Sequence, residues 1–245
     1  MEWFDCNIGF GVARVPPGPF AATAQELLKE MDSCGVAAAL VCHAAMRDES
    51  AQAGNRLVVE KTRGLPRLHP AWAILPPQTG EMGTVAEWLE GMRKQGVKAL
   101  VAYPEQHRYL LNGLTFGPLL EEMIARRIPL ILGPDWRNVT ALLAEFPQLT
   151  LILVGHGSWG EDRYYRPLLE RYPGFHVDTS NYALDGGIAD AVRKYGPDRL
   201  VYGSGFPELQ MGGSLMMVAT ADISDEARVA IAEGNLRRLL AEVKL

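Results

Sequence analysis

Short apolar runs alternate with amphipathic segments along the whole chain, and this alternation limits the possible folds more than any other feature. The runs are rich in Val, Ile and Leu and are bounded by Gly, Pro, Asp or Asn. Such runs are typical of strands that are buried on both faces in a parallel sheet. Eight strands are predicted, at 2–7, 36–42, 70–75, 97–103, 128–132, 149–154, 175–179 and 199–202.

The segments between these strands carry apolar residues at helical spacing. In the segment 24–33, Leu27, Leu28 and Met31 share one face, and Thr23 precedes it as the predicted N-cap. A closing helix is predicted over 225–243, with Ser224 as its N-cap and acidic residues in its first turn. Further helices are predicted at 85–94, 116–127, 139–145, 165–171 and 188–195.

Eight strands that alternate with helices in 245 residues predict a parallel β/α (TIM) barrel, for which about 250 residues is typical. An open doubly wound sheet would show a GxGxxG motif after its first strand, but Gly9-Phe10-Gly11-Val12-Ala13 stands there instead. The sequence shows no internal repeat and no linker. We therefore expect a single barrel domain over residues 1–245.

Charge and composition narrow the classes of partner. The 24 Lys and Arg residues against 29 Asp and Glu residues leave a net charge of −5, which disfavours nucleic acids and anionic membranes as partners. No apolar run approaches the roughly 20 residues that span a bilayer, and the start Met1–Asp5 does not resemble a signal peptide. Three scattered cysteines fit a reducing cytoplasm. The expectation is a cytoplasmic protein with a small-molecule partner.

Polar residues that follow the predicted strands are the candidate site, because active sites of such barrels lie at the carboxyl ends of the strands. His156, after the sixth strand, is the candidate acid or base, since imidazole titrates near neutrality. The alternative for His156 is a packed histidine bonded to a neighbouring carbonyl. Asp135 is the second candidate catalytic residue. Candidate substrate-binding residues are Asn7, His43, Glu105, Trp136, Arg137 and Asp178.

The aromatic-rich segment 158–166 has two interpretations. Its Trp and Tyr side chains suit a lid over the barrel mouth, and they equally suit a contact between copies in a homo-oligomer. The sequence does not separate these two roles.

Several segments resemble one family, the amidohydrolase-related branch of the amidohydrolase superfamily, which includes aminocarboxymuconate-semialdehyde decarboxylase. The resemblance runs nearly end to end and is most specific near the C-terminus. It is seen in Phe4-Asp5, LLKEMDSCGVAAALV (27–41), Asn55, Ala71–Pro77, GVKALVAYP (96–104), IPLILG (128–133), LILVGHGSW (151–159), VDTSNY (177–182), DRLVYGSGFP (198–207) and ISDEARVAIAEGNLRRLL (223–240).

The resemblance implies a divalent metal at the barrel mouth, but this chain lacks most of the implied ligands. Asn7 and Gly9 stand where the family has its His-x-His pair, and Gly133 and Gly205 replace a later histidine and the aspartate after the eighth strand. Only His156 stands at a ligand position. A catalytic zinc needs about three protein ligands and an open position, so we expect no metal and no other cofactor.

The resemblance implies a hydrolase or decarboxylase-like activity on a small carbonyl or carboxylate compound. In this chain it would proceed without the metal, with His156 as acid or base and Asp135, Arg137 or Asn7 positioning the substrate. The alternative is a non-catalytic relative that binds a small ligand or a partner through the barrel mouth. A third interpretation is a rebuilt metal site made of His43, His156, Asp178 and Glu105.

Overall fold

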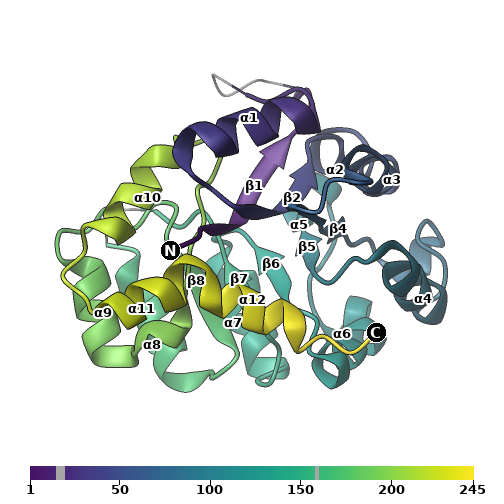
Figure 1. The fold of residues 1–245 in the computed structure, drawn as a ribbon. Helices are drawn as coiled ribbons and strands as arrows, with labels where there is room; N and C mark the ends of the chain where they lie inside the picture. The colour runs from purple at the N-terminus through teal and green to yellow at the C-terminus, as the bar shows by residue number, and fades with distance from the viewer. Residues whose placement is uncertain (15–19, 158–159) are drawn as a thin grey trace.

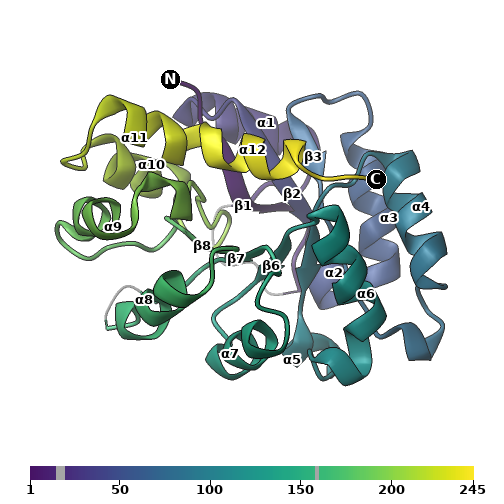
Figure 2. The same ribbon diagram turned by 90° about the horizontal axis from the view of Figure 1, so that it is seen from below.

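The computed structural model describes residues 1–14, 20–157 and 160–245. Strands lie at the centre of the molecule, and helices surround them (Figure 1). The same arrangement is seen from below in Figure 2. The strands are β1 (Phe4–Phe10), β2 (Ala38–His43), β3 (Leu68–Pro70), β4 (Trp72–Ala73), β5 (Leu100–Ala102), β6 (Leu130–Leu132), β7 (Leu151–Leu153), β8 (Phe175–Asp178) and β9 (Leu200–Val201).

All strand pairs are parallel and follow chain order, as β1-β2-β3 and as β4 to β9. Ala71 separates β3 from β4, and its N–H donates to the Val41 carbonyl at 3.0 Å, next to the bond from Trp72 N–H to the Ala99 carbonyl. The predicted strand 70–75 is therefore divided where it changes hydrogen-bond partners. The described residues thus hold nine strand segments rather than the eight predicted.

The two outer edges of this strand array meet. The N–H of Cys6 donates to the Tyr202 carbonyl at 2.9 Å, and the N–H of Gly9 donates to the Phe206 carbonyl at 2.8 Å. Ile8 and Phe206 form a parallel bridge between the same two segments. The strands therefore close into a ring, which confirms the predicted TIM-barrel class.

Helices follow the strands in the predicted alternation, and two longer helices, α3 and α10, add to those predicted from spacing. In the described part of the chain, no helix has the length and apolar character needed to cross a membrane. The helices are α1 (Ala24–Cys34), α2 (Ala45–Asp48), α3 (Ala51–Thr62), α4 (Val85–Gln95), α5 (Pro104–His107), α6 (Gly113–Arg126), α7 (Trp136–Glu145), α8 (Asp162–Arg171), α9 (Gly187–Tyr195), α10 (Met211–Ala219), α11 (Asp225–Val229) and α12 (Asn235–Ala241).

Local capping sets where several helices begin. The Thr23 hydroxyl accepts the N–H of Glu26, and the Glu26 carboxylate accepts the N–H of Thr23, so the predicted cap of α1 is confirmed as a full capping box. Asp135 caps α7, which starts three residues earlier than its apolar pattern predicts. Trp136 begins the helix at helical spacing from Val139, although the sequence analysis assigned it to substrate binding.

The predicted closing helix 225–243 is not one regular α-helix. The predicted Ser224 cap is confirmed, but a π-helical segment, Ala230–Gly234, separates α11 from α12. The Ile231 carbonyl within it accepts the N–H of Tyr202 at 2.9 Å, and the Asn235 side chain donates to the carbonyls of Pro197 and Leu200. The segment widens where the helix is bonded to the end of β9, as π-type turns commonly do at such contacts.

Buried apolar side chains from strands and helices form one cluster around the barrel. Strands β6 and β7 consist entirely of buried Leu and Ile, which confirms that these strands are covered on both faces. On α1, Leu27 and Met31 are fully buried against the strands, and each such side chain contributes about 1.5–3 kcal/mol of transfer free energy. The helices therefore hold the carboxyl ends of the strands in a fixed arrangement.

Candidate active site

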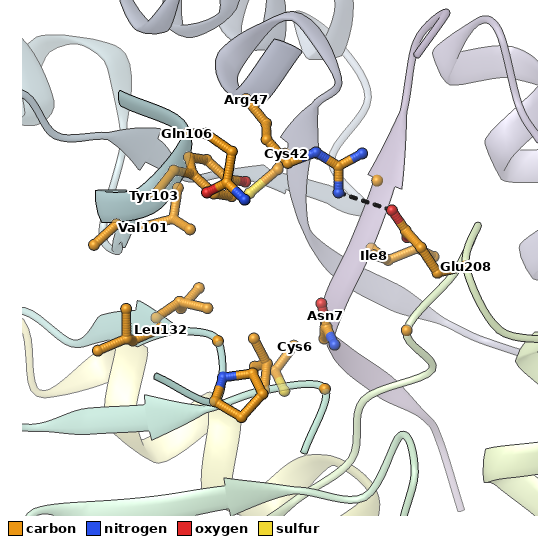
Figure 3. Close-up of a pocket in the computed structure, with 18 of the residues that line it drawn as sticks. Cys6, Asn7, Ile8, Cys42, Arg47, Val101, Tyr103, Gln106, Leu132 and Glu208 are labelled. Atoms are coloured by element: carbon orange, nitrogen blue, oxygen red, sulfur yellow. Dashed lines mark hydrogen bonds and ion pairs between the residues drawn. The ribbon is translucent and has the colours of Figure 1, made fainter. Parts of the chain in front are cut away.

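A cavity of about 1060 Å³ lies at the carboxyl ends of the strands, where active sites of β/α barrels are found (Figure 3). The ends of β1, β2, β5 and β6 contribute to its wall, together with segments that follow β7, β8 and β9. Its apolar wall includes Ile8, Leu40, Val101 and Leu132. Its polar wall includes Asn7, His43, Arg47, Tyr103, Glu105, Gln106, Asp135, Trp136, Arg137, Tyr164, Asn181 and Glu208.

Asn7 is held at the cavity wall by two buried carboxyl groups. Its N–H donates to Oδ1 of Asp5 at 2.9 Å, and its side-chain Nδ2 donates to Oδ2 of Asp178 at 3.0 Å. Asp178 also accepts the N–H of Gly155 at 3.1 Å. The side-chain nitrogen of Asn7 is bonded to Asp178 below the cavity, so the side-chain oxygen points toward the cavity (Figure 3). Asn7 therefore presents a hydrogen-bond acceptor to a ligand.

The two carboxyl groups beneath Asn7 have no exposed surface. Burial raises the pKa of Asp5 to about 7, because the charged form is poorly solvated there. Burial also raises the pKa of Asp178, while the nearby His156 acts in the opposite direction. Asp178 does not line the cavity, so its predicted role in substrate binding is at most indirect, through Asn7.

His156 is packed below the cavity and is only 1% exposed. Its Nδ1 lies 3.0 Å from the Gly157 carbonyl, and its Nε2 lies 3.2 Å from the Asp178 carbonyl. The rings of Tyr165 and Tyr182 pack against it, with centroids 5.1 and 5.4 Å away. The geometry matches the alternative interpretation of His156, a packed histidine bonded to carbonyls, and leaves neither ring nitrogen directed at a ligand.

Four predicted residues lie together on the opposite rim of the cavity. Glu105 and Arg137 are exposed there, whereas Asp135 is engaged as the cap of α7 through the N–H and the side chain of Asn138. Trp136 stacks on Tyr164, with ring centroids 5.0 Å apart and planes 15° apart. Within the described residues the Trp136 Nε1–H is buried without an acceptor. This rim therefore offers an aromatic surface to a ligand.

His43 lines the cavity at the end of β2 with a defined tautomer. Its Nδ1 accepts the N–H of Ala45 at 3.2 Å, so the ring proton of the neutral form resides on Nε2. Burial lowers the pKa of His43, which keeps the ring neutral near pH 7. The ring packs tightly against Gly11, where φ is +101° and a Cβ would lie 2.8 Å from Nε2. Glycine is therefore required at this position.

Arg47 is a cavity residue that sequence reasoning missed. It lies on the short helix α2, and its guanidinium pairs with Asp48 at 3.0 Å and with Glu208 at 2.9 Å (Figure 3). Arg47 and Glu208 are 161 positions apart in the chain. The only local signal is a cationic residue four positions after β2, since α2 is too short to show helical periodicity.

The residues at the family's ligand positions do not fit a divalent metal. Gly9, Gly133 and Gly205 supply no metal-binding side-chain atom, the Asn7 amide nitrogen is bonded to Asp178, and both ring nitrogens of His156 face backbone carbonyls. Among the described residues, no three His, Cys, Asp or Glu side chains come together as metal ligands. The interpretation of a site rebuilt from His43, His156, Asp178 and Glu105 is thus wrong, because the structure divides these four between the cavity wall and the packed layer below.

Fold and cavity together define a TIM-barrel protein with a candidate active site at the barrel mouth. The sequence profile of a family described as Amidohydrolase matches residues 23–241, and the chain belongs to this family. No sequence among the curated proteins matches the chain.

Solved structures show the same fold at low sequence identity. An uncharacterized TIM-barrel protein from Bordetella bronchiseptica is 18% identical, with 99% of each chain covered and a TM-score of 0.76. A 2,6-dihydroxybenzoate decarboxylase from Rhizobium is 18% identical, with 98% of this chain and 99% of that chain covered and a TM-score of 0.72. A 5-carboxyvanillate decarboxylase from Sphingomonas paucimobilis is 16% identical, with 99% of each chain covered and a TM-score of 0.74.

Proposed function

We propose that the protein is a hydrolase or decarboxylase-like enzyme that acts on a small carbonyl or carboxylate compound without the divalent metal implied by its family. The observation that carries the proposal is the cavity of about 1060 Å³ at the carboxyl ends of the strands. Family membership and two structurally similar decarboxylases support the class of reaction and of compound. Ordinary small-molecule sites have volumes of about 300–1,000 Å³, so the cavity is large enough.

We assign to His43 the role of hydrogen-bonding to the reacting carbonyl group of the substrate. As a neutral imidazole with its proton on Nε2, it would donate to a carbonyl oxygen as negative charge develops there. The Asn7 oxygen would accept a hydrogen bond from a substrate hydroxyl or from water. Arg137 and Glu105 lie on the exposed rim, where they would position the substrate.

The test combines metal analysis with an activity panel of esters, lactones and hydroxybenzoates. We expect turnover by protein that contains far less than one metal ion per chain and has been treated with a chelator. His43→Gln should lower kcat by roughly 10²–10³-fold, the usual cost of losing one donor to a developing oxyanion. His69→Gln is the matched control, because His69 lies on β3 away from the cavity wall. Turnover that a chelator abolishes and Zn²⁺ or Mn²⁺ restores would overturn the proposal.

A second candidate function is ligand binding without catalysis. The observation that favours it is the packing of His156, whose two ring nitrogens face backbone carbonyls below the cavity and not a ligand. A binding protein of this kind would be stabilised by its ligand without forming product. Thermal-shift measurements with the same panel, followed by product analysis, separate the two functions.

A further inference from the structure

Arg47 has two carboxylate partners and still retains hydrogen-bonding capacity at the cavity. Its Nε donates to Asp48 Oδ1 at 3.0 Å, and its Nη1 donates to Glu208 Oε1 at 2.9 Å. Within the residues that the structure describes, its Nη2 has no partner. A guanidinium carries five N–H donors, so this one remains able to bind a further acceptor.

The two partners of Arg47 differ in how firmly they are held. Asp48 is largely buried, with a side chain that is 15% exposed, and its other oxygen accepts the N–H of Arg14 at 3.0 Å. Glu208 follows β9 in a loop, its side chain is 48% exposed, and Arg47 is its one ion-pair partner among the described residues. Asp48 therefore fixes the orientation of the guanidinium, whereas Glu208 can leave at little cost.

Arg47 and Glu208 both line the cavity, and their contact spans one side of it (Figure 3). Tyr103, Gln106 and Cys42 lie near Arg47 on this side and carry no negative charge at neutral pH, since burial raises the pKa of Cys42 to about 11. An anion that enters the cavity thus meets Arg47 with Glu208 as its main competitor.

We propose that Arg47 is the specificity-determining residue that binds the carboxylate of the ligand, and that Glu208 takes the place of this carboxylate in the ligand-free protein. Binding exchanges one carboxylate for another on the same guanidinium, so Arg47 is paired in both states and is never buried as an isolated charge. The inference rests on the proposed function in taking the ligand to be a small carboxylate. It adds that Arg47 selects ligands that carry a negative charge.

Benzoate and its uncharged counterpart benzamide test this proposal by calorimetric titration of the whole protein. Arg47→Met should weaken benzoate binding by about tenfold or more, as expected for a charge-assisted hydrogen bond. Glu208→Gln should strengthen it by about two- to fivefold, because it removes the competing half of an exposed salt bridge. Benzamide binding should differ little among these proteins. Arg93→Met and Glu90→Gln are matched controls, since this Arg–Glu pair lies on α4 outside the cavity.

Three outcomes would overturn the proposal. The first is equal benzoate affinity in the wild type and Arg47→Met, and the second is that neither the wild type nor Glu208→Gln binds benzoate. The third is a Glu208→Gln variant that is less stable and shows no gain in benzoate affinity. The last would show that the pair is only structural, and it does not depend on whether Arg47→Met folds. Turnover of uncharged esters and lactones tests the proposed enzyme separately, because these compounds carry no carboxylate.

Discussion

The backbone N–H of Ser204 donates a hydrogen bond of 2.9 Å to Oδ1 of Asp5, and so joins the segment after β9 to β1. The same oxygen accepts the N–H of Asn7, whereas Oδ2 is buried without a partner in the described part of the chain. One buried carboxyl group therefore helps to close the barrel directly beneath the candidate site.

The protonation of Asp5 should make stability depend on pH. Burial raises its pKa to about 7 from an ordinary 3.8, so between these values the folded protein holds a proton that the unfolded chain has released. Its contribution to the free energy of unfolding therefore falls as pH rises, by up to about 1.4 kcal/mol per pH unit. Asp5→Asn keeps an oxygen acceptor but does not titrate. We expect this variant to gain stability relative to the wild type between pH 4 and 7 in urea unfolding, and a difference that is constant with pH would contradict the assignment.

Replacement of His156 should lower the stability of the fold. His156→Phe removes the ring nitrogens that face the carbonyls of Gly157 and Asp178, and a buried carbonyl left unpaired costs about 1–3 kcal/mol. We expect a loss of this order in denaturant unfolding, partly restored in His156→Asn. Unchanged stability together with lost turnover would instead show that His156 acts in catalysis.

Asn55 should be a strong determinant of stability, because it bonds the backbone of the third strand region twice. Its Nδ2 donates to the Ala73 carbonyl at 2.9 Å, and its Oδ1 accepts the Ala73 N–H at 2.7 Å, both buried. Asn55→Ala should cost about 2–4 kcal/mol, since two buried backbone groups lose their partner. Thr140→Ala, which removes exposed bonds on α7, is the control and should cost far less. Equal losses in the two variants would refute this account.

Gly54 should tolerate no side chain. A Cβ there would lie 2.5 Å from Met46 Cα on α2, and backbone atoms cannot move aside cheaply. Gly54→Ala should therefore destabilise the protein by about 1–3 kcal/mol through overpacking and displace the helix that carries Arg47. The control is Gly213→Ala on α10, which is exposed and where a Cβ meets no atom within 4 Å, and helix propensity favours alanine by up to about 1 kcal/mol. Thermal unfolding measures both, and we expect opposite signs.

Local sequence signals predicted the barrel well. The caps at Thr23 and Ser224, the apolar strands and the alternation of strands with helices all depend on residues within one or two turns of each other. The break at Ala71 and the π-helical segment after α11 were not predictable, since both depend on hydrogen bonds to distant strands.

The sequence by itself determined the fold class. It also determined that Gly9, Gly133 and Gly205 supply no metal-binding side chain, because a missing side chain needs no structure to be recognised. Six of the eight site candidates line the cavity, and His156 and Asp178 lie below it. Only the tertiary structure decided which polar groups face the cavity: it packs His156 among carbonyls and tyrosines, and it pairs Arg47 with Glu208 across 161 positions. The physical reason is that the direction of a side chain at a strand end depends on neighbours from other strands, which no local pattern specifies.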